Sequence, residues 1–235
     1  MVLWEKVNRS FVDERSGETY NETILRWGKN MQEKPLPLIC VYSASSVRIA
    51  DKYFIVAREL SQQMVKNGYG LCFGGGKRGL MGAMADEILK ENGTLVGVIP
   101  EALMDLELAH ECCTELVVTQ TMRQRKQTME DKSEAFIALP GGFGTFEELL
   151  EIITLKQLGY HTKPIVILNA FGYYDALLAQ FEMAYREEFA GREDSEIYFV
   201  AEDADNAVRY IKEYKDRGKT RSKSVVGFAT DPASD

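Results

Sequence analysis

The sequence is poor in the residues that build metal and redox sites. It has two histidines and four cysteines in 235 residues, and no two cysteines are spaced as Cys-x-x-Cys. Two of the cysteines fall in apolar runs, so we expect buried, reduced thiols, and we expect neither a metal ion nor a cofactor. The histidines, His110 and His161, have no partner at ligand spacing, and we expect them at the surface or in loops.

Positive charge is also scarce. The 28 Lys and Arg residues are outnumbered by 36 Asp and Glu residues, which gives a net charge of −8. A chain this acidic is repelled at long range by nucleic acids and by anionic membrane surfaces, so we expect partners of neither kind. Any anion that it binds must be held by local donors.

Long apolar stretches are absent from the sequence as well. No segment approaches the roughly 18 apolar residues that indicate a membrane span, and residues 1–30 carry charges throughout, unlike a signal peptide. We therefore expect a cytoplasmic protein. An apolar fraction of 45% in 235 residues is enough for one generous domain with a buried core.

What the sequence does have is a regular alternation of short apolar runs and helical patterns. The apolar runs predict strands at 36–42, 71–73, 94–99, 115–119, 135–139, 164–168 and 197–200. The helical patterns between and after them predict helices at 49–67, 80–91, 121–132, 145–158, 173–189 and 203–214. Strands that are apolar throughout and separated by helices indicate a parallel sheet covered on both faces. The sequence thus predicts an α/β fold: a single Rossmann-like, doubly wound domain with a mostly parallel sheet of six to seven strands.

This pattern also predicts the limits of the domain. Residues 35–217 hold all the predicted strands and are predicted to form the Rossmann-like domain. Residues 1–34 are predicted to be an N-terminal helical extension, and residues 218–235 a polar, mobile tail.

Two glycine-rich loops each follow a strand and open a helix. The first runs from Gly74 to Gly79 and satisfies G-x-G-x-x-G, with Glu101 at roughly the distance expected of a dinucleotide site. Leu80 and Met81 stand where a P-loop requires Lys and Ser or Thr, so it is not a P-loop. Glycines directly after a strand can present several N–H groups to one phosphate, or they can simply form a tight turn.

The second loop, Pro140 to Thr145, follows the strand at 135–139. Loops at the carboxyl ends of neighbouring parallel strands form one crevice, and Ser43, Ser45 and Ser46 after the first strand end on the same side. A phosphate cradle with a second wall of donors suits a mononucleotide.

Charged residues open two helices, the one after the second glycine loop and the one after the predicted strand at 115–119. Glu147 and Glu148 lie in the first turn after Gly144, where they can be functional or can cap the helix, since Thr145-x-x-Glu148 matches a capping box. Arg125 and Lys126 are adjacent in the helix at 121–132 and therefore point about 100° apart, so they need not share a role. Without further context, this basic helix start reads as solvated.

Three blocks together resemble the LOG ("Lonely guy") phosphoribohydrolases, a family of cytokinin-activating enzymes and of bacterial proteins once labelled possible lysine decarboxylases. They are FGGGKRGLMG from Phe73, MRQRK from Met122 and PGGFGTFEE from Pro140, and the resemblance covers roughly residues 37–214. It implies a homodimer or an assembly of dimers that hydrolyses a purine nucleoside 5′-monophosphate, either AMP or a cytokinin riboside monophosphate, to free base and ribose 5-phosphate.

The resemblance also implies roles for individual residues. Arg125 and the Glu147–Glu148 pair would carry the catalytic work, although the sequence does not say which glutamate acts. Substrate and phosphate would be held by Ser45, Ser46, Gly74, Gly75, Gly76, Gly79, Met122, Lys126, Gly141, Gly142, Gly144 and Thr145. A carboxylate can stabilise the oxocarbenium-like sugar, whereas Arg125, always charged, can stabilise negative charge on the purine or fix the carboxylate.

Two departures from the family pattern and two rival functions remain. Arg123 stands where the family block has His, and Ala44 replaces a usual glycine, so the preferred base or the number of phosphates can differ. One rival is a non-catalytic nucleotide or cofactor carrier of the molybdenum-cofactor-carrier type, for which the paired glutamates have less use. The other is an NAD(P)-dependent oxidoreductase, which leaves the second glycine loop unexplained.

Overall fold

The computed structural model describes residues 10–12, 19–21, 36–107, 109–110 and 112–214. The chain divides into two compact units, Met1–Leu36 and Pro37–Asp235. In the first unit, β1 (Ser10–Val12) pairs with β2 (Thr19–Asn21) in antiparallel fashion, in a segment that the sequence predicts to be helical. The rest of that segment and the tail at 218–235 lie outside the described residues, so the domain limits stay predictions.

Within the described part of the second unit, seven parallel strands form one sheet, in the order β6-β5-β4-β3-β7-β8-β9. The strands are β3 (Leu38–Tyr42), β4 (Gly70–Phe73), β5 (Leu95–Pro100), β6 (Glu115–Thr119), β7 (Ala135–Ala138), β8 (Ile165–Leu168) and β9 (Phe199–Ala201). The chain winds outward from β3 to β6 on one side, then returns to the centre and winds outward again from β7 to β9. The predicted doubly wound α/β fold is confirmed.

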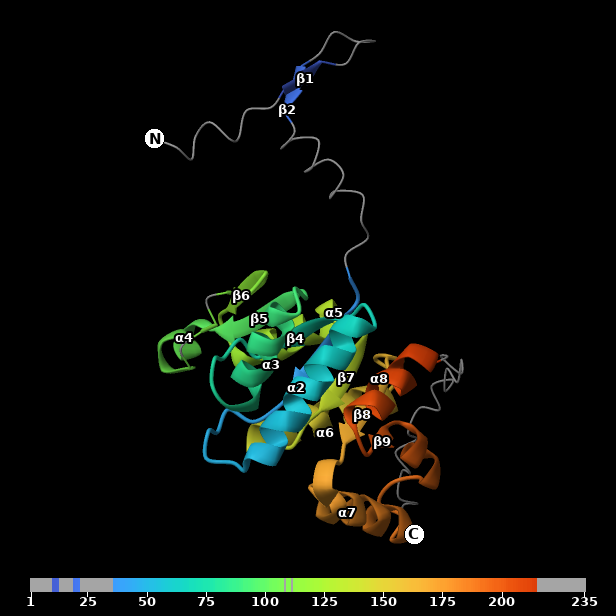
Figure 1. Ribbon diagram of the computed structural model, residues 1–235. Helices are drawn as coiled ribbons and strands as arrows, with labels where there is room; N and C mark the ends of the chain where they lie inside the picture. Colours follow the sequence, from blue (N-terminus) through green and yellow to red (C-terminus); the bar gives the residue numbers. More distant parts are fainter. Residues whose placement is uncertain (1–9, 13–18, 22–35, 108, 111, 215–235) are drawn as a thin grey trace, which may run out of the picture. The chain divides into compact units, whose positions relative to one another are not determined.

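Helices cover both faces of the sheet (Figure 1). On one face lie α2 (Asp51–Lys66), α3 (Gly79–Lys90) and α8 (Ala204–Glu213), and on the other α5 (Met122–Lys132), α6 (Phe143–Gln157) and α7 (Asp175–Arg186). Alternate strand residues feed the two cores: Ile39 and Val41 face the first set of helices, whereas Cys40 and Tyr42 face the second. Burial on both faces explains why the strands are apolar throughout rather than alternating.

Three short elements were not expected. The helix α4 (Glu101–Glu107) begins directly after β5, and two short 3₁₀ helices are η1 (Ala170–Gly172) and η2 (Arg192–Glu196). Segments this short span no more than two helical turns, so hydrophobic periodicity cannot reveal them. The structure finds no helix among the described residues that is both long and apolar enough to cross a membrane.

Both histidines lie in loops, one of the two expected positions, but neither is at the surface, because both are buried. His161 Nε2 lies 3.0 Å from the carbonyl oxygen of Ile152, and its Nδ1 accepts a hydrogen bond from the Lys163 amide. Burial lowers the pKa of His161 to about 4, so the ring is neutral at pH 7. Its ring packs against that of Phe136, with the ring centroids 5.5 Å apart.

The strand order reverses between β3 and β7. These two strands pair directly, although β4, β5 and β6 lie between them in the sequence. In a doubly wound sheet such a point leaves a crevice at the carboxyl ends of the strands, because the connections leave in opposite directions. The loops after β3, β4 and β7 all end at this edge.

Candidate active site

A cavity of about 330 Å³ lies at this edge of the sheet. Its walls come from the serine loop after β3, from Gly74 after β4, from the start of α6 after β7, and from α5. The two glycine loops are not on neighbouring strands, because β3 lies between β4 and β7. The serine loop therefore fills the gap between them, and all three loops belong to one crevice.

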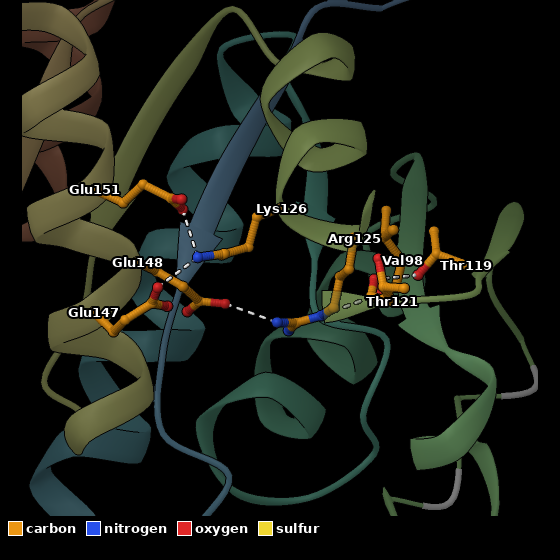
Figure 2. A network of polar contacts seen from close by, with 8 residues as sticks. All are labelled: Val98, Thr119, Thr121, Arg125, Lys126, Glu147, Glu148 and Glu151. Carbon is orange, nitrogen blue, oxygen red and sulfur yellow. Dashed lines mark hydrogen bonds and ion pairs between the residues drawn. The ribbon is translucent and has the colours of Figure 1, made fainter. Parts of the chain in front are cut away.

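A buried ion pair forms the polar centre of the cavity wall. Arg125 Nη1 donates a hydrogen bond of 2.8 Å to Glu148 Oε1, and Arg125 Nε donates one of 3.1 Å to the Val98 carbonyl oxygen. Arg125 and Glu148 are only 8% and 9% exposed. Figure 2 shows the guanidinium reaching from α5 toward the carboxylate on α6. The interpretation of this helix start as solvated is wrong for Arg125.

The environment of Glu148 tunes its acidity. Burial raises the pKa of its carboxyl above the usual 4.5, and the charge and hydrogen bond of Arg125 oppose that rise without cancelling it. Tyr42, which also lines the cavity, has its pKa raised, first by burial and then by the neighbouring Cys40 thiol and the Glu148 charge. A buried carboxylate with a raised pKa, facing a cavity, is a common feature of catalytic sites.

The neighbouring charged residues form a separate group of ion pairs. Lys126 Nζ contacts the carboxylates of Glu147 and Glu151, at 2.9 Å from Glu151 Oε2. The Glu147 side chain is 56% exposed, and in Figure 2 Lys126 and Arg125 both reach toward α6 but end at different carboxylates. Arg125 and Lys126 thus have different partners, as their expected separation on the helix allows, and so do Glu148 and Glu147.

The capping-box interpretation of Thr145 and Glu148 is wrong. The helix α6 begins at Phe143 with Gly142 at its N-cap, and no side chain caps it. Thr145 is therefore already the third helical residue, and Glu148 bonds Arg125 instead of the backbone. The first backbone amides of α6 have no carbonyl partner within the helix. Because Gly142 and Gly144 adjoin open space, these amides can reach an anion in the cavity.

The first glycine loop has a different role from the second. A Cβ on Gly74 would lie 2.1 Å from Arg125 Nη2, so this glycine makes room for the guanidinium. A Cβ on Gly79 would lie 2.5 Å from the Ala44 oxygen, and the Leu80 amide donates to that same oxygen at 2.9 Å. The loop thus packs directly against the backbone of the serine loop.

The structure brings most of the predicted site residues to the cavity, but not all. The residues that line it are Ser45, Ser46, Gly74, Met122, Arg125, Gly142, Gly144, Thr145, Glu147 and Glu148. Those that do not are Gly75, Gly76, Gly79, Lys126 and Gly141. Gly75 and Gly79 both have φ near +70°, at 77° and 62°, which favours glycine for conformation alone.

Several lining residues were not among the predicted site residues. Apolar side chains come from Val41, Met81, Leu103, Met129 and Phe143. Leu103 belongs to the unexpected helix α4, so no sequence signal pointed to it. Among the residues that the structure describes, no group of three or more His, Cys, Asp and Glu side chains could hold a metal ion.

Comparison with known proteins identifies similar sequences. The family described as possible lysine decarboxylase matches residues 81–211. The chain is 40% identical to a cytokinin riboside 5′-monophosphate phosphoribohydrolase of Arabidopsis thaliana, over 75% of this chain and 83% of the relative. It is 42% identical to a probable enzyme of the same name from Oryza sativa subsp. japonica, over 82% of this chain and 84% of the relative.

Solved structures share the fold at lower identity. The molybdenum cofactor carrier protein of Chlamydomonas reinhardtii superposes with a TM-score of 0.59 at 22% identity, over 75% of this chain and 96% of that one. The molybdenum cofactor binding protein of Rippkaea orientalis gives a TM-score of 0.59 at 22% identity, over 77% and 98%. At this identity the likeness concerns the fold alone.

Proposed function

Because this chain belongs to the LOG family, which is also described as possible lysine decarboxylase, we propose that it hydrolyses the N-glycosidic bond of a purine nucleoside 5′-monophosphate. The products are the free base and ribose 5-phosphate. The substrate is AMP or a cytokinin riboside monophosphate, the type of nucleotide that the relatives are named for. The observation that carries the proposal is the buried Arg125–Glu148 pair in the wall of a nucleotide-sized cavity.

Glu148 is the catalytic carboxylate in this proposal. Cleavage of the bond to the base develops positive charge on the ribose C1′. The Glu148 carboxylate stabilises that charge and orients or deprotonates the attacking water. Its raised pKa supports this role, because a carboxylate with a raised pKa is a stronger base. Glu147 also lines the cavity, but its side chain is half exposed and is paired with Lys126, so we assign it a supporting role.

Arg125 fixes the catalytic carboxylate. Its guanidinium remains charged and cannot protonate the leaving base. The hydrogen bonds to Glu148 and to the Val98 carbonyl hold it between α6 and the sheet, which favours orientation of the carboxylate over direct contact with the purine. A carboxylate held in one rotamer beside C1′ loses little freedom in the transition state.

The phosphate binds at the N-terminus of α6. The amides of Gly142, Phe143 and Gly144 and the hydroxyls of Ser45 and Ser46 supply donors, and the helix adds its partial positive charge. The purine packs on the apolar side chains of Leu103 and of the cavity methionines. Binding of the remote phosphate orients the sugar at the carboxylate, which contributes to the rate.

A substrate panel tests the proposal. Purified protein is incubated with AMP, GMP, IMP and isopentenyladenosine 5′-monophosphate, and free base and ribose 5-phosphate are separated by chromatography. We expect at least one purine monophosphate to be cleaved, and Glu148→Gln and Arg125→Ala to lower kcat at least about a hundredfold. Glu147→Gln is the matched control and should keep kcat within about threefold. Absence of cleavage throughout the panel would overturn the proposed reaction.

The carrier function is the second candidate, and only the fold favours it. The molybdenum cofactor proteins share the architecture at 22% identity, whereas the phosphoribohydrolases are similar at about 40%. A carrier needs no carboxylate with a raised pKa in its cavity. Binding of the nucleotide without release of base by the wild type would favour the carrier.

We propose further that the enzyme is cytoplasmic and acts as a homodimer or an assembly of dimers. The four cysteines are free thiols, which suits a reducing compartment. The outer face of α6 exposes Phe143, Leu150 and Leu158, spaced so that they share one side of the helix. An apolar stripe of this kind can pack on its copy in a second subunit. Light scattering should give a dimer or larger assembly, and Leu150→Asp should shift it toward monomer.

A further inference from the structure

Two adjacent tyrosines donate hydrogen bonds to the backbone at the start of the second glycine loop. Tyr173 donates its hydroxyl hydrogen to the Gly141 carbonyl oxygen at 2.5 Å, and Tyr174 donates to the Leu139 carbonyl oxygen at 2.7 Å. These carbonyls flank Pro140, at the turn between β7 and α6. Burial raises the pKa of Tyr174, so its phenol stays protonated and remains a donor. Neither tyrosine lines the cavity.

The segment that carries the tyrosines is itself rigidly held. Asn169 accepts a hydrogen bond from the Tyr174 amide at 2.7 Å and donates one to Asp175 at 2.8 Å. Phe171 and Gly172 both adopt left-handed conformations, with φ of 58° and 70°. Such a conformation is unusual for a bulky residue such as Phe, and it persists where neighbours hold it.

Aromatic contacts supply that hold. The Tyr53 ring lies edge-on to both Phe171 and Tyr173, with centroids 5.8 Å apart in each pair. The Lys52 ammonium lies 4.4 Å from the Phe171 ring centroid. Both Lys52 and Tyr53 belong to the first turn of α2, which follows the serine loop. This aromatic cluster therefore links the start of α2, directly after the serine loop, to the segment that carries Tyr173.

The hydrogen bond from Tyr173 fixes the orientation of one peptide unit. A planar trans peptide directs its carbonyl oxygen and its N–H in opposite directions. The Gly141 oxygen points to Tyr173, which does not line the cavity, so the Gly142 N–H points away from Tyr173, and Gly142 itself lines the cavity. Without the phenol, this glycine-flanked peptide could rotate, because glycine tolerates most backbone conformations.

We propose that Tyr173 is a positioning residue of the phosphate subsite, whose hydroxyl keeps the Gly142 N–H aimed at the substrate phosphate. This inference rests on the proposed function, since it assumes that the phosphate lies at the start of α6. The residue acts through the backbone and does not touch the substrate. Its loss should therefore weaken phosphate binding and leave the chemistry at C1′ nearly unchanged.

The test compares Tyr173→Phe with a matched phenol deletion elsewhere. Tyr185→Phe serves as the control, because its hydroxyl bonds that of Tyr198 at 3.2 Å and neither residue lines the cavity. We measure kcat and KM for AMP or the best monophosphate of the panel, and the Kd of ribose 5-phosphate by calorimetry. For Tyr173→Phe we expect KM and Kd to rise about fivefold to tenfold and kcat to stay within about twofold, as for one weakened hydrogen bond to an anion. Tyr185→Phe should change neither.

A ligand without phosphate separates positioning from a general structural role. Adenosine is used as a competitive inhibitor, and its inhibition constant should be the same for wild type and Tyr173→Phe. Equal weakening of adenosine and ribose 5-phosphate, unchanged KM and Kd, a fall in kcat alone, or unfolding of Tyr173→Phe at 25 °C would each overturn the proposal. If the wild type cleaves no monophosphate, the proposed function fails, whereas the ribose 5-phosphate titration still tests the subsite.

Discussion

Replacement of Gly74 by alanine tests whether the position of Arg125 controls catalysis. The added Cβ would lie 2.1 Å from Arg125 Nη2, and real Cβ contacts essentially never fall below 3.0 Å, so the guanidinium has to move. It cannot do so freely, because the Val98 carbonyl and the Glu148 carboxylate hold it at 3.1 Å and 2.8 Å. The methyl group therefore pushes against the one side chain that fixes the proposed catalytic carboxylate.

The size of the effect follows from these distances. A shift of about 1 Å in a group that positions a catalytic residue lowers turnover about a hundredfold. The buried pair is stretched rather than broken, so we expect the free energy of unfolding to fall by about 1–3 kcal/mol, less than for removal of one partner. Steady-state kcat on the preferred monophosphate and chemical denaturation measure the two quantities separately.

The control is a second crowded glycine that does not touch the ion pair. A Cβ on Gly82 would lie 2.3 Å from the backbone oxygen of Lys77. Gly82→Ala should therefore destabilise the protein while its folded fraction keeps a kcat close to that of the wild type. The reasoning is refuted if Gly74→Ala retains kcat within about twofold, because the guanidinium would then have moved without consequence.

Three further predictions concern charge and pH. Burial raises the pKa of Glu148, so its neutral form persists to higher pH than that of an ordinary carboxyl. The acid limb of the kcat/KM profile should therefore lie above pH 4.5, and it should move higher still in Arg125→Leu, which removes the opposing charge. An acid limb at or below pH 4.5 contradicts this. Lys126→Met should change KM by less than about threefold, since Lys126 pairs with exposed carboxylates; a tenfold rise would return it to the phosphate site. The lowered pKa of His161 stabilises the fold fully above pH 6.5 and progressively less toward pH 4, so the melting temperature should fall over this range more in the wild type than in His161→Gln.

Much of the fold could be predicted because its signals are periodic or compositional. Each strand is buried on both faces and therefore reads as an apolar run, and the helices between them are long enough to show their period. α4 escaped because it has seven residues and starts directly after a strand. The buried histidines escaped because their partners include the Ile152 carbonyl and Asp86, which sequence spacing does not reveal.

The sequence motifs identify most, but not all, of the residues that the structure brings to the cavity, and they do not give its geometry. The motifs singled out Arg125, Glu147 and Glu148, yet only tertiary packing separates the buried glutamate from the exposed one. The capping box failed because the helix starts two residues before Thr145, at a glycine-rich turn where composition hides the boundary. Similarly, glycines that give space to Arg125 and to the Ala44 backbone look, in sequence, like glycines that bind phosphate.

The central position of β3 has a practical consequence for dividing the chain. The exposed turn at Asn92 separates α3 from β5, and a cut there leaves Ser45 and Gly74 on one fragment and Arg125 and Glu148 on the other. Neither fragment alone contains a complete cavity wall, whereas β4 and β5 pair along the cut when the halves meet. Fusing the halves to two interacting proteins would thus make the release of free base a signal of their association, a split-enzyme reporter.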